Sequence, residues 1–520
     1  MNPNPAGPYR PFVFLAAGLV VFCVLLSLPI PEGLTSPARN MMAVAGLMAV
    51  WWLGEAVPIP VTALLPLVLY PLLGILPSKD VGPFYGNHLI FLFLGGFMIA
   101  LSMERCGLHR RIALGIIHRM GLGIKRLVLG FMLASAFLSM WISNTATTLM
   151  LLPVAMAVVR QVALCARIPG KTEQESRQAV VSGLGPVLML ALAYSASLGG
   201  VGTLIGTPPN IVFAGFWKGQ FPGREEIGFT DWMLVALPLV VVFLPLVWWF
   251  LCRFVSPFAL DDIHASGEGG GVIEREIALL GPMSRLEKFV ATVFGLTALL
   301  WVFRKPIDLG ALILPGWSSW LDGPGLVHDA TVAIGMGILL MTVPLSLGAG
   351  AESKAETETM LVALDWDTFV KGVPWGILLL FGGGFALAGG IRATGLDVWI
   401  GNHLSATADL PLPLVIFGLC LGLTFLTELT SNTATATMIL PVVGAAAEAA
   451  GIEPLMLMIP ATLSVSCAFM MPVATPPNAI VFGSGWVSIP VMARTGLILN
   501  LVGAVLVTLL TLLIVPVVLL

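Results

Sequence analysis

Apolar runs about as long as a bilayer is thick dominate this chain, and they leave few alternatives to a membrane fold. A helix that crosses the hydrocarbon core needs about 20 mostly apolar residues. Only 10% of the 520 residues are charged, against about 25% in soluble domains, so most of the surface is expected to face lipid. The pattern predicts an all-α polytopic membrane protein with about 11 transmembrane helices. The expected full spans are 11–31, 41–59, 61–77, 88–104, 184–216, 231–252, 287–304, 329–347, 373–391, 455–484 and 492–518.

Two further apolar regions are each divided by the tripeptide Ser-Asn-Thr, at Ser143-Asn144-Thr145 and at Ser431-Asn432-Thr433. Each arm beside a tripeptide has about 15 residues, too few to cross the bilayer comfortably but enough to enter and return. The regions therefore predict two re-entrant hairpins. Their arms are 128–142 with 146–159, and 413–427 with 434–447, which gives hairpins over 128–159 and 413–447.

The hairpins belong to a larger duplicated unit. The pairs Gly96-Phe97 and Gly107-Leu108 and the run Ser143 to Thr147 each recur at a constant offset of 288 in residue number, at Gly384, Gly395 and Ser431. A second motif, Thr-Pro-Pro-Asn, begins at Thr207 and begins again at Thr475, an offset of 268. Because the motifs keep the same order in both copies, the chain contains an internal repeat.

Each Pro-Pro pair lies inside a predicted span. Proline removes an N–H donor and clashes with the preceding turn, so 184–216 and 455–484 are expected to be helices broken at Gly206-Thr207 and Ala474-Thr475. Broken helices and hairpin tips expose carbonyl groups that bind Na⁺ and helix N-termini that favour anions. Ser-Asn-Thr adds neutral donors and acceptors. The pattern predicts a site for an anion and cations without a buried Arg or Lys.

Lysine and arginine orient the chain, because loops rich in them stay in the cytoplasm. Six of them lie within 105–126 and four within 160–177, on either side of the first hairpin, whereas 393–493 has none. The first hairpin is therefore expected to enter from the cytoplasm and the second from outside, an inverted-topology repeat. Counting spans places the N-terminus in the cytoplasm and the C-terminus outside.

Several segments between the spans carry their own expectations. The uncharged start, Met1 to Pro8, does not resemble a cleaved signal, so the first apolar run is expected to stay as a span. The stretch 105–120 fits either a helix along the cytoplasmic interface or an ordinary basic loop, and both remain open. Residues 255–286 are expected to form a cytoplasmic loop, flexible at the glycine-rich 265–272.

Other function classes are disfavoured. A net charge of -3 without a basic patch gives no sign of nucleic-acid binding. The six cysteines are scattered without a CxxC and are interpreted as small apolar residues. The sequence has no HExxH, GxSxG or Walker A motif, so an enzyme or an ATP-driven pump is not expected. Glu428, whose repeat counterpart is Met140, is either an ion- or proton-coupling group or a satisfied structural acid.

Together these motifs resemble the divalent anion/sodium symporter family. The likeness rests on the doubled tips, the Pro-Pro-Asn breaks, and the segments Glu55 to Pro66 and Ser466 to Val481, and it covers almost the whole chain. It implies a homodimer in the cell (inner) membrane, in which a transport domain moves against a scaffold domain in an elevator-type cycle. The implied parts are scaffold helices in 1–127 and 287–412 and transport parts in 128–254 and 413–520, separated by the loop 255–286.

The resemblance also assigns site residues. One Na⁺ would bind at each tip, several ligands being backbone carbonyls: Ser139, Ser143, Asn144 and Gly206 at the first, and Thr427, Thr430, Asn432 and Ala474 at the second. The substrate carboxylates would be held by Asn144, Thr145, Thr207, Asn432, Thr433 and Thr475. Thr430 departs from the small apolar residue expected there, which matters little if its carbonyl is the ligand.

The implied function is Na⁺-coupled uptake of C4-dicarboxylates such as succinate, malate or fumarate. Citrate, sulfate or 2-oxoglutarate remain alternative substrates. Na⁺-independent exchange of dicarboxylates and a channel remain alternative modes.

Overall fold

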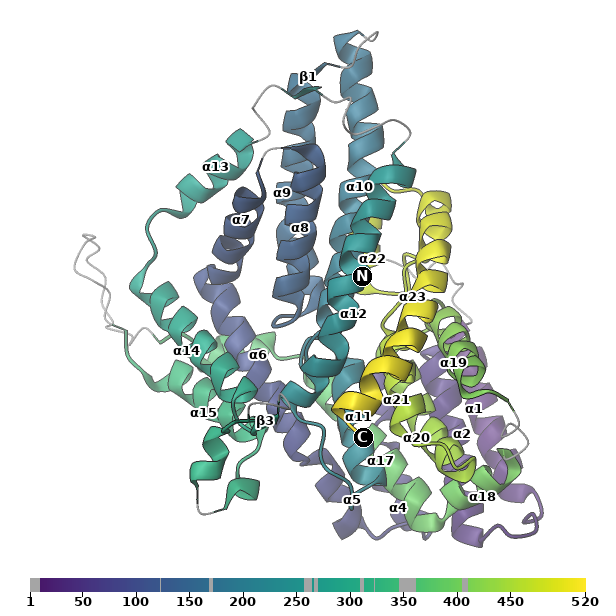
Figure 1. Ribbon diagram of the computed structural model, residues 1–520. Coiled ribbons are helices and arrows are strands. Elements are labelled where there is room, and N and C mark those ends of the chain that lie inside the picture. Colours follow the sequence, from purple (N-terminus) through teal and green to yellow (C-terminus); the bar gives the residue numbers. More distant parts are fainter. Residues whose placement is uncertain are drawn as a thin grey trace.

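The computed structural model describes residues 10–121, 123–167, 172–256, 264–265, 270–308, 313–321, 323–345, 362–404 and 410–520. These residues are mainly helical, as predicted (Figure 1). Two short antiparallel strand pairs join loops: β1 (Ala166–Arg167) with β2 (His264–Ala265), and β3 (Ile307–Asp308) with β4 (Ile313–Leu314).

The helices fall into two halves that follow the sequence repeat. The first half contains α1 Arg10–Ser27, α2 Ser36–Gly54, α3 Ile59–Thr62, α4 Leu65–Leu72, α5 Ser78–Tyr85, α6 His88–Cys106, α7 Leu108–Met120, α8 Ile124–Ser139, α9 Asn144–Cys165, α10 Glu173–Val201, α11 Pro208–Gln220 and α12 Phe229–Phe250, which continues as a π-helical turn over Leu251–Val255. Helix α13 Gly270–Leu280 follows. The second half contains α14 Arg285–Val302, α15 Asp329–Thr342, α16 Trp366–Gly372, α17 Trp375–Thr394, α18 Leu396–Leu404, α19 Leu412–Thr427, α20 Asn432–Ala449, α21 Leu455–Val465, α22 Pro476–Gly483 and α23 Ile489–Val518. Two 3₁₀ turns, Trp317–Trp320 and Pro324–Leu326, lie between α14 and α15.

Helix boundaries repeat with the same offsets as the motifs. Helices α6 and α8 end at Cys106 and Ser139. At the offset of 288, these residues correspond to Thr394 and Thr427, the last residues of α17 and α19. The first residue of α11, Pro208, has the first residue of α22 as its counterpart at the offset of 268. In Figure 1 the α8–α9 hairpin descends from the upper end, whereas α19 and α20 lie in the lower right half. The duplication in sequence is therefore a duplication in structure.

Six helices of the described chain are long and apolar enough to cross a membrane by length and composition: the α5–α6 unit, α9, α10, α12 with its π-helical turn, α17 and α23. The predicted span 61–77 is wrong as a single helix. It is divided into α3 and α4, and Ile59–Leu72 is too short by the same measure. The division has a sequence cause, because Pro66 lies in the first turn of the second helix and cannot continue the preceding one.

Two other predicted segments differ from their expected form. Helix α9 has 22 residues and ends at Cys165, so the second arm of the first hairpin is longer than predicted, because its buried face continues through Val162 and Ala163. The loop 255–286 contains the helix α13, which starts at Gly270, inside the stretch predicted to be flexible. Residues 266–269 of that stretch lie outside the described residues.

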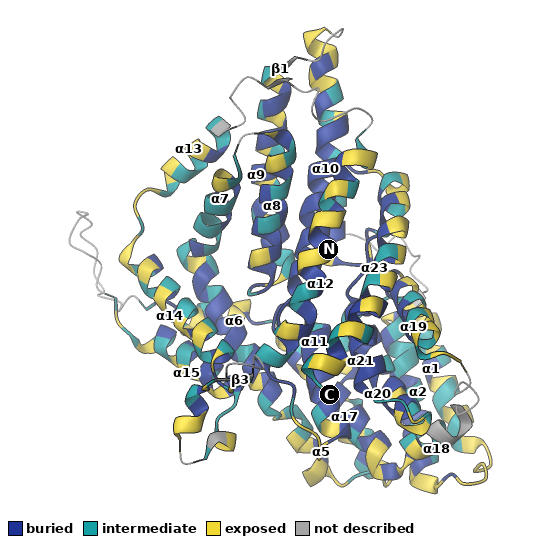
Figure 2. Ribbon diagram, viewed as in Figure 1, coloured by how far each residue is buried: buried dark blue, intermediate teal, exposed yellow. Residues whose placement is uncertain are grey.

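Helix α10 is buried over its second half, where all residues from Val187 to Val201 are buried (Figure 2). It packs tightly against α8, because a Cβ atom at Gly199 would lie 2.1 Å from the carbonyl oxygen of Ala136. Only a glycine allows this approach, which brings the end of α10 directly behind the tip of the first hairpin.

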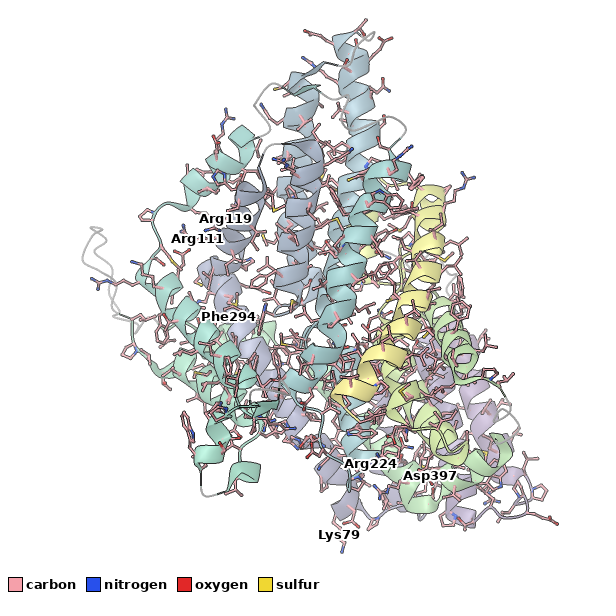
Figure 3. All side chains as sticks on the ribbon, viewed as in Figure 1. Lys79, Arg111, Arg119, Arg224, Phe294 and Asp397 are labelled. Carbon is pink, nitrogen blue, oxygen red and sulfur yellow. The ribbon has the colours of Figure 1, made fainter. Side chains whose placement is uncertain are left out.

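The stretch 105–120, left open by the sequence, is the helix α7. Arg111 on α7 forms a two-point ion pair with Glu287, with Nε–Oε1 at 2.8 Å and Nη2–Oε2 at 3.3 Å. The same guanidinium donates to the carbonyl oxygens of Leu280 and Gly281, at the C-terminus of α13. Arg111 therefore joins α7 to the end of α13 and the start of α14; Figure 3 labels it beside Arg119.

We expect Arg111→Ala to destabilise the protein by about 3 kcal/mol, because it leaves a nearly buried carboxylate, Glu287, without its cation. Arg119→Ala is the matched control, since Arg119 is exposed and, among the described residues, donates to Gly115 of its own helix. Thermal unfolding in detergent measures both. Equal unfolding midpoints for the two variants would contradict the assignment.

Candidate functional site

A cavity of about 1040 Å³ lies between the two hairpin tips and the two helix breaks. Ten predicted site residues line it: Ser143, Asn144, Thr145, Gly206, Thr207, Thr430, Asn432, Thr433, Ala474 and Thr475. The two others, Ser139 and Thr427, are fully buried at the last residues of α8 and α19, just behind the tips. The fold therefore brings together residues from opposite halves of the sequence.

Four helices begin at this cavity. Their first residues, Asn144 of α9, Pro208 of α11, Asn432 of α20 and Pro476 of α22, all line it. A helix N-terminus carries a partial positive charge. The first N–H donors come from α9 and α20, because α11 and α22 begin with Pro-Pro and lack them. The described lining includes no Lys, Arg or His and has two acids, Glu55 and Glu104. Attraction for an anion therefore comes from helix ends and neutral side chains.

Oxygen atoms converge behind the first tip. A Cβ atom at Gly206 would lie 2.4 Å from the carbonyl oxygen of Gly200 and 2.9 Å from that of Ser139. A Cβ atom at Gly200 would lie 2.5 Å from Asn144 Oδ1 and 3.1 Å from the Gly206 oxygen. Asn144 Oδ1 and Ser139 Oγ are also buried without a hydrogen-bond partner. Unpartnered buried oxygens are costly, and a cation such as Na⁺ would satisfy them here.

The second tip has a related arrangement. Thr427 Oγ1 lies 2.6 Å from Asn432 Oδ1 and 3.0 Å from the carbonyl oxygen of Val465. A hydroxyl has one proton and satisfies only one of these acceptors at a time. These three oxygens share one proton, and a cation such as Na⁺ would satisfy them. Ala474 also lines the cavity. Thr430, predicted as a ligand, uses its hydroxyl on Leu426 O and Thr435 Oγ1.

The asparagines of the two Thr-Pro-Pro-Asn motifs hold the broken helices together. Asn210 Nδ2 lies 3.3 Å from the Gly200 carbonyl and 2.7 Å from that of Thr203. Asn478 Nδ2 lies 3.2 Å and 3.1 Å from the counterpart carbonyls of the second repeat, those of Ala468 and Met471. Both asparagines are fully buried. Sequence reasoning did not assign them a role, although their place in the repeated motif was a signal.

Glu428 supports the second break. Its carboxylate accepts hydrogen bonds from the backbone N–H groups of Phe469, Met470 and Met471 at 2.7–2.9 Å, and from Asn500 Nδ2 at 2.7 Å. Four donors satisfy an ionised carboxylate, so the geometry favours the structural role over ion or proton coupling.

The first repeat supports its break without an acid. Thr203 Oγ1 donates to the carbonyl oxygen of Met140, and Trp232 Nε1 donates to that of Val201. Trp232 and Asn500 are separated by the same offset as the Thr-Pro-Pro-Asn motifs, so the two residues are repeat counterparts. The second break spans 466–475 and is longer than the first at 202–207. The longer segment leaves more N–H groups unpaired, and Glu428 accepts three of them.

Trp141 fixes the first tip against neighbouring helices. Its ring stacks on Trp301 at 6.5 Å and meets Phe294 edge-on at 4.9 Å, both from α14; Phe294 is labelled in Figure 3. The repeat counterpart of Trp141 is Leu429, which is 69% exposed and lines the cavity. The two tips are therefore alike in their motif but different in how they are held.

We expect Gly206→Ala to abolish Na⁺-dependent substrate binding, because its methyl group would enter the space between the Gly200 and Ser139 oxygens. Gly295→Ala is the control, since a methyl group there meets no atom within 4 Å. Substrate-induced thermal stabilisation, measured with and without Na⁺, tests this. Unchanged Na⁺ dependence in Gly206→Ala would refute the first cation site.

Comparisons with known proteins add independent information. The family model described as "Sodium:sulfate symporter transmembrane region" matches residues 10–520. The chain is 39% identical over 504 residues to the sodium-dependent dicarboxylate transporter SdcS of Staphylococcus saprophyticus, a match that covers 97% of this chain and 91% of that protein. It is 40% identical over 505 residues to SdcS of Staphylococcus aureus, with the same coverage. The crystal structure of the Alcanivorax borkumensis YdaH transporter aligns with a TM-score of 0.53 and 14% identity, over 97% of this chain and 98% of that one, a likeness of fold alone.

Proposed function

Because this chain belongs to the sodium:sulfate symporter family, we propose that it is a secondary transporter that couples the uptake of C4-dicarboxylates to Na⁺. The observation that carries the proposal is the cavity, in which four helix N-termini face one space and buried oxygens converge behind each tip. The names of its SdcS relatives support Na⁺ and a dicarboxylate as the transported species.

The two-tip arrangement suits an anion with a negative group at each end. Asn144 and Thr145 would hold one carboxylate, Asn432 and Thr433 the other, with Thr207 and Thr475 beside them. Thr475 already accepts a hydrogen bond from the Asn478 N–H, whereas the Thr207 side chain has no such capping bond. Thr207 is therefore the freer of the two hydroxyls for a substrate oxygen.

Bound Na⁺ would complete the anion site by balancing the negative charge of the substrate carboxylates. One Na⁺ would bind at Ser139, Ser143, Asn144 and Gly206, with the Gly200 carbonyl as a further ligand. The second would bind at Thr427, Thr430, Asn432 and Ala474, with the Val465 carbonyl. An anion that shares Asn144 and Asn432 with these cations binds tightly only when they are present, which gives obligatory coupling.

The orientation inferred from Lys and Arg indicates that the cavity opens towards the cytoplasm. The cavity lining includes Pro11, Glu55, Glu104 and Gly372. Each of these residues lies at or near the end of a predicted span that the orientation places on the cytoplasmic side. The structure would therefore be an inward-facing state, with the N-terminus cytoplasmic and the C-terminus outside the cell membrane. A homodimer, in which parts 128–254 and 413–520 move against scaffold parts 1–127 and 287–412, would alternate the exposure of this site.

Uptake of labelled succinate into proteoliposomes tests the proposal. We expect uptake to require an inward Na⁺ gradient and to increase with an inside-negative potential when net positive charge enters; about 2.3 kcal/mol per charge is available at 100 mV. Competition by malate, fumarate, citrate, 2-oxoglutarate and sulfate ranks the substrates. Uptake that persists unchanged without Na⁺ would refute coupling and favour exchange.

A further inference from the structure

Three side chains with metal-binding atoms meet far from the cavity mouth. They are His88 at the start of α6, Glu226 in the connection from α11 to α12, and His328 just before α15. Their ligand atoms all lie within 4.8 Å of one another. Glu104, which lines the cavity, lies near the opposite end of α6 from His88, about 24 Å away at the α-helical rise. The cluster is thus separate from the proposed transport site.

Two histidine nitrogens converge on one carboxylate oxygen. His88 Nε2 and His328 Nε2 lie 2.6 Å and 3.2 Å from the same oxygen, Glu226 Oε1. The two imidazole rings meet edge-on with centroids 4.4 Å apart. The side chains of His88, Glu226 and His328 are 39%, 21% and 18% exposed, so a metal ion can enter from solvent while water completes its coordination.

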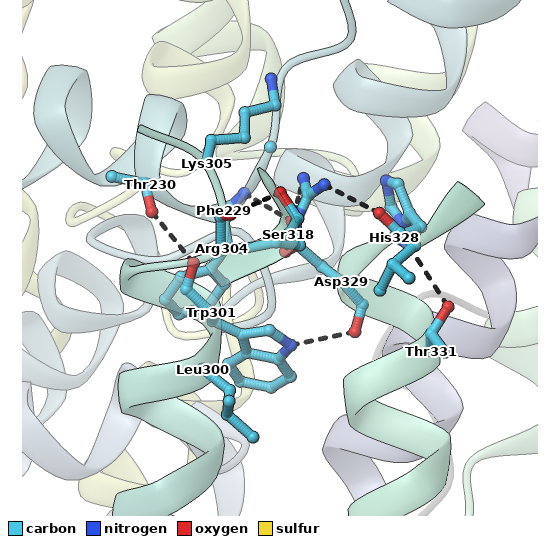
Figure 4. Close-up of polar contacts among 12 residues, drawn as sticks. Phe229, Thr230, Leu300, Trp301, Arg304, Lys305, Ser318, His328, Asp329 and Thr331 are labelled. Carbon is cyan, nitrogen blue, oxygen red and sulfur yellow. Dashed lines mark hydrogen bonds and ion pairs between the residues drawn. The ribbon is translucent and has the colours of Figure 1, made fainter. Parts of the chain in front are cut away.

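Hydrogen bonds around the cluster hold its parts in place. His328 Nδ1 accepts from the Ala330 N–H at 3.1 Å and caps α15, and Figure 4 shows His328 beside the Arg304–Asp329 pair. A metal ion on Nε2 requires the proton on Nδ1, so binding exchanges this cap for a metal bond. The capping bond from the His328 N–H to Thr331 Oγ1 remains.

The surrounding charges permit a cation. Lys305 is engaged by Asp231 at 3.1 Å and by the main-chain oxygen of Glu226, and Arg304 is paired with Asp329. The cluster and its neighbours thus contain three carboxylates, those of Glu226, Asp231 and Asp329, and two cationic side chains, those of Arg304 and Lys305. The Glu226 oxygen Oε1 faces both histidine nitrogens and is placed to act as a ligand.

We propose that His88, Glu226 and His328 form a binding site for Zn²⁺ or a similar transition-metal ion. Two imidazoles and one carboxylate with an open position are a ligand set of zinc sites. Imidazole ligands disfavour Mg²⁺ and Ca²⁺, which take oxygen ligands. A bound ion would tie the α11–α12 connection to the starts of α6 and α15. The proposal does not depend on what the protein transports.

Metal binding to the EDTA-treated protein tests the site directly. We expect one Zn²⁺ per chain by calorimetry, a raised unfolding midpoint, and the absorption spectrum of a tetrahedral site when Co²⁺ replaces Zn²⁺. Glu226→Gln and His88→Gln should each weaken Zn²⁺ binding by more than about 100-fold, beyond the effect of losing an outer partner.

The variant His328→Asn separates the metal role from the capping role. Asparagine caps helices well, so this variant should fold like the wild type and still lose Zn²⁺. His118→Ala is the control, because His118 is exposed on α7, and it should bind Zn²⁺ normally. Failure of the wild type to bind Zn²⁺ at 100-fold molar excess would overturn the site, as would full binding by both His88→Gln and His328→Asn.

Discussion

Asn144→Ala and Asn432→Ala should each abolish uptake while the protein still folds. Each asparagine lies at the first residue of a helix, lines the cavity, and presents a side-chain oxygen to the neighbouring cation position. Removing it takes away a proposed Na⁺ ligand and a donor to the substrate at once. We expect uptake in proteoliposomes to fall by at least about 100-fold, because an unmade charge-assisted contact costs roughly 1.5–3 kcal/mol and two are lost.

The control for these variants is Asn40→Ala. Asn40 donates to the carbonyl oxygen of Leu73 and does not line the cavity, so uptake should continue. Folding is checked by gel filtration and by the unfolding midpoint without Na⁺, which should stay near that of the wild type. If either tip variant transported at near-normal rates, the site would have to be placed elsewhere.

Glu428→Gln should produce the largest loss of stability among the single substitutions. Glutamine keeps one oxygen that can accept from Phe469 and Met470, but its NH₂ group would face the backbone N–H of Met471, in a side chain that is 3% exposed. We expect a loss of about 3 kcal/mol or more, because one buried N–H loses its acceptor and the remaining hydrogen bonds lose their charge assistance. Since the segment 466–475 carries Ala474 and Thr475, Na⁺ affinity should fall with it.

Thermal unfolding with and without Na⁺ measures this effect. Glu448→Gln, on the exposed face of α20, should behave like the wild type. A Glu428→Gln protein of normal stability with a changed number of transported charges would instead favour a coupling role for Glu428.

Much of the fold was readable from the sequence because its signals are local. Length and polarity of apolar runs predicted helices, and the two constant offsets between motifs predicted which helices are counterparts. The errors also had local causes. Pro66 marks the division of the predicted span 61–77. The basic stretch 105–120 is a helix that is held by contacts with α13 and α14.

The site was only partly readable, since carbonyl ligands leave no mark in the sequence. Every residue has a carbonyl group, so Gly200 and Val465 gave no sign that theirs point at a cation position. Asn210 and Asn478 occupy the same position of the repeated motif. Their hydrogen bonds across the helix breaks, however, depend on how the chain folds back at each break.

By itself, the sequence determined that this chain is a helical membrane protein with two copies of a Ser-Asn-Thr hairpin tip. Composition, proline and repetition are properties that can be read along the chain. Only the tertiary structure decided that Glu428 supports a backbone segment and that His88, Glu226 and His328 meet. Those outcomes depend on contacts between residues far apart in sequence, and such contacts are set by packing.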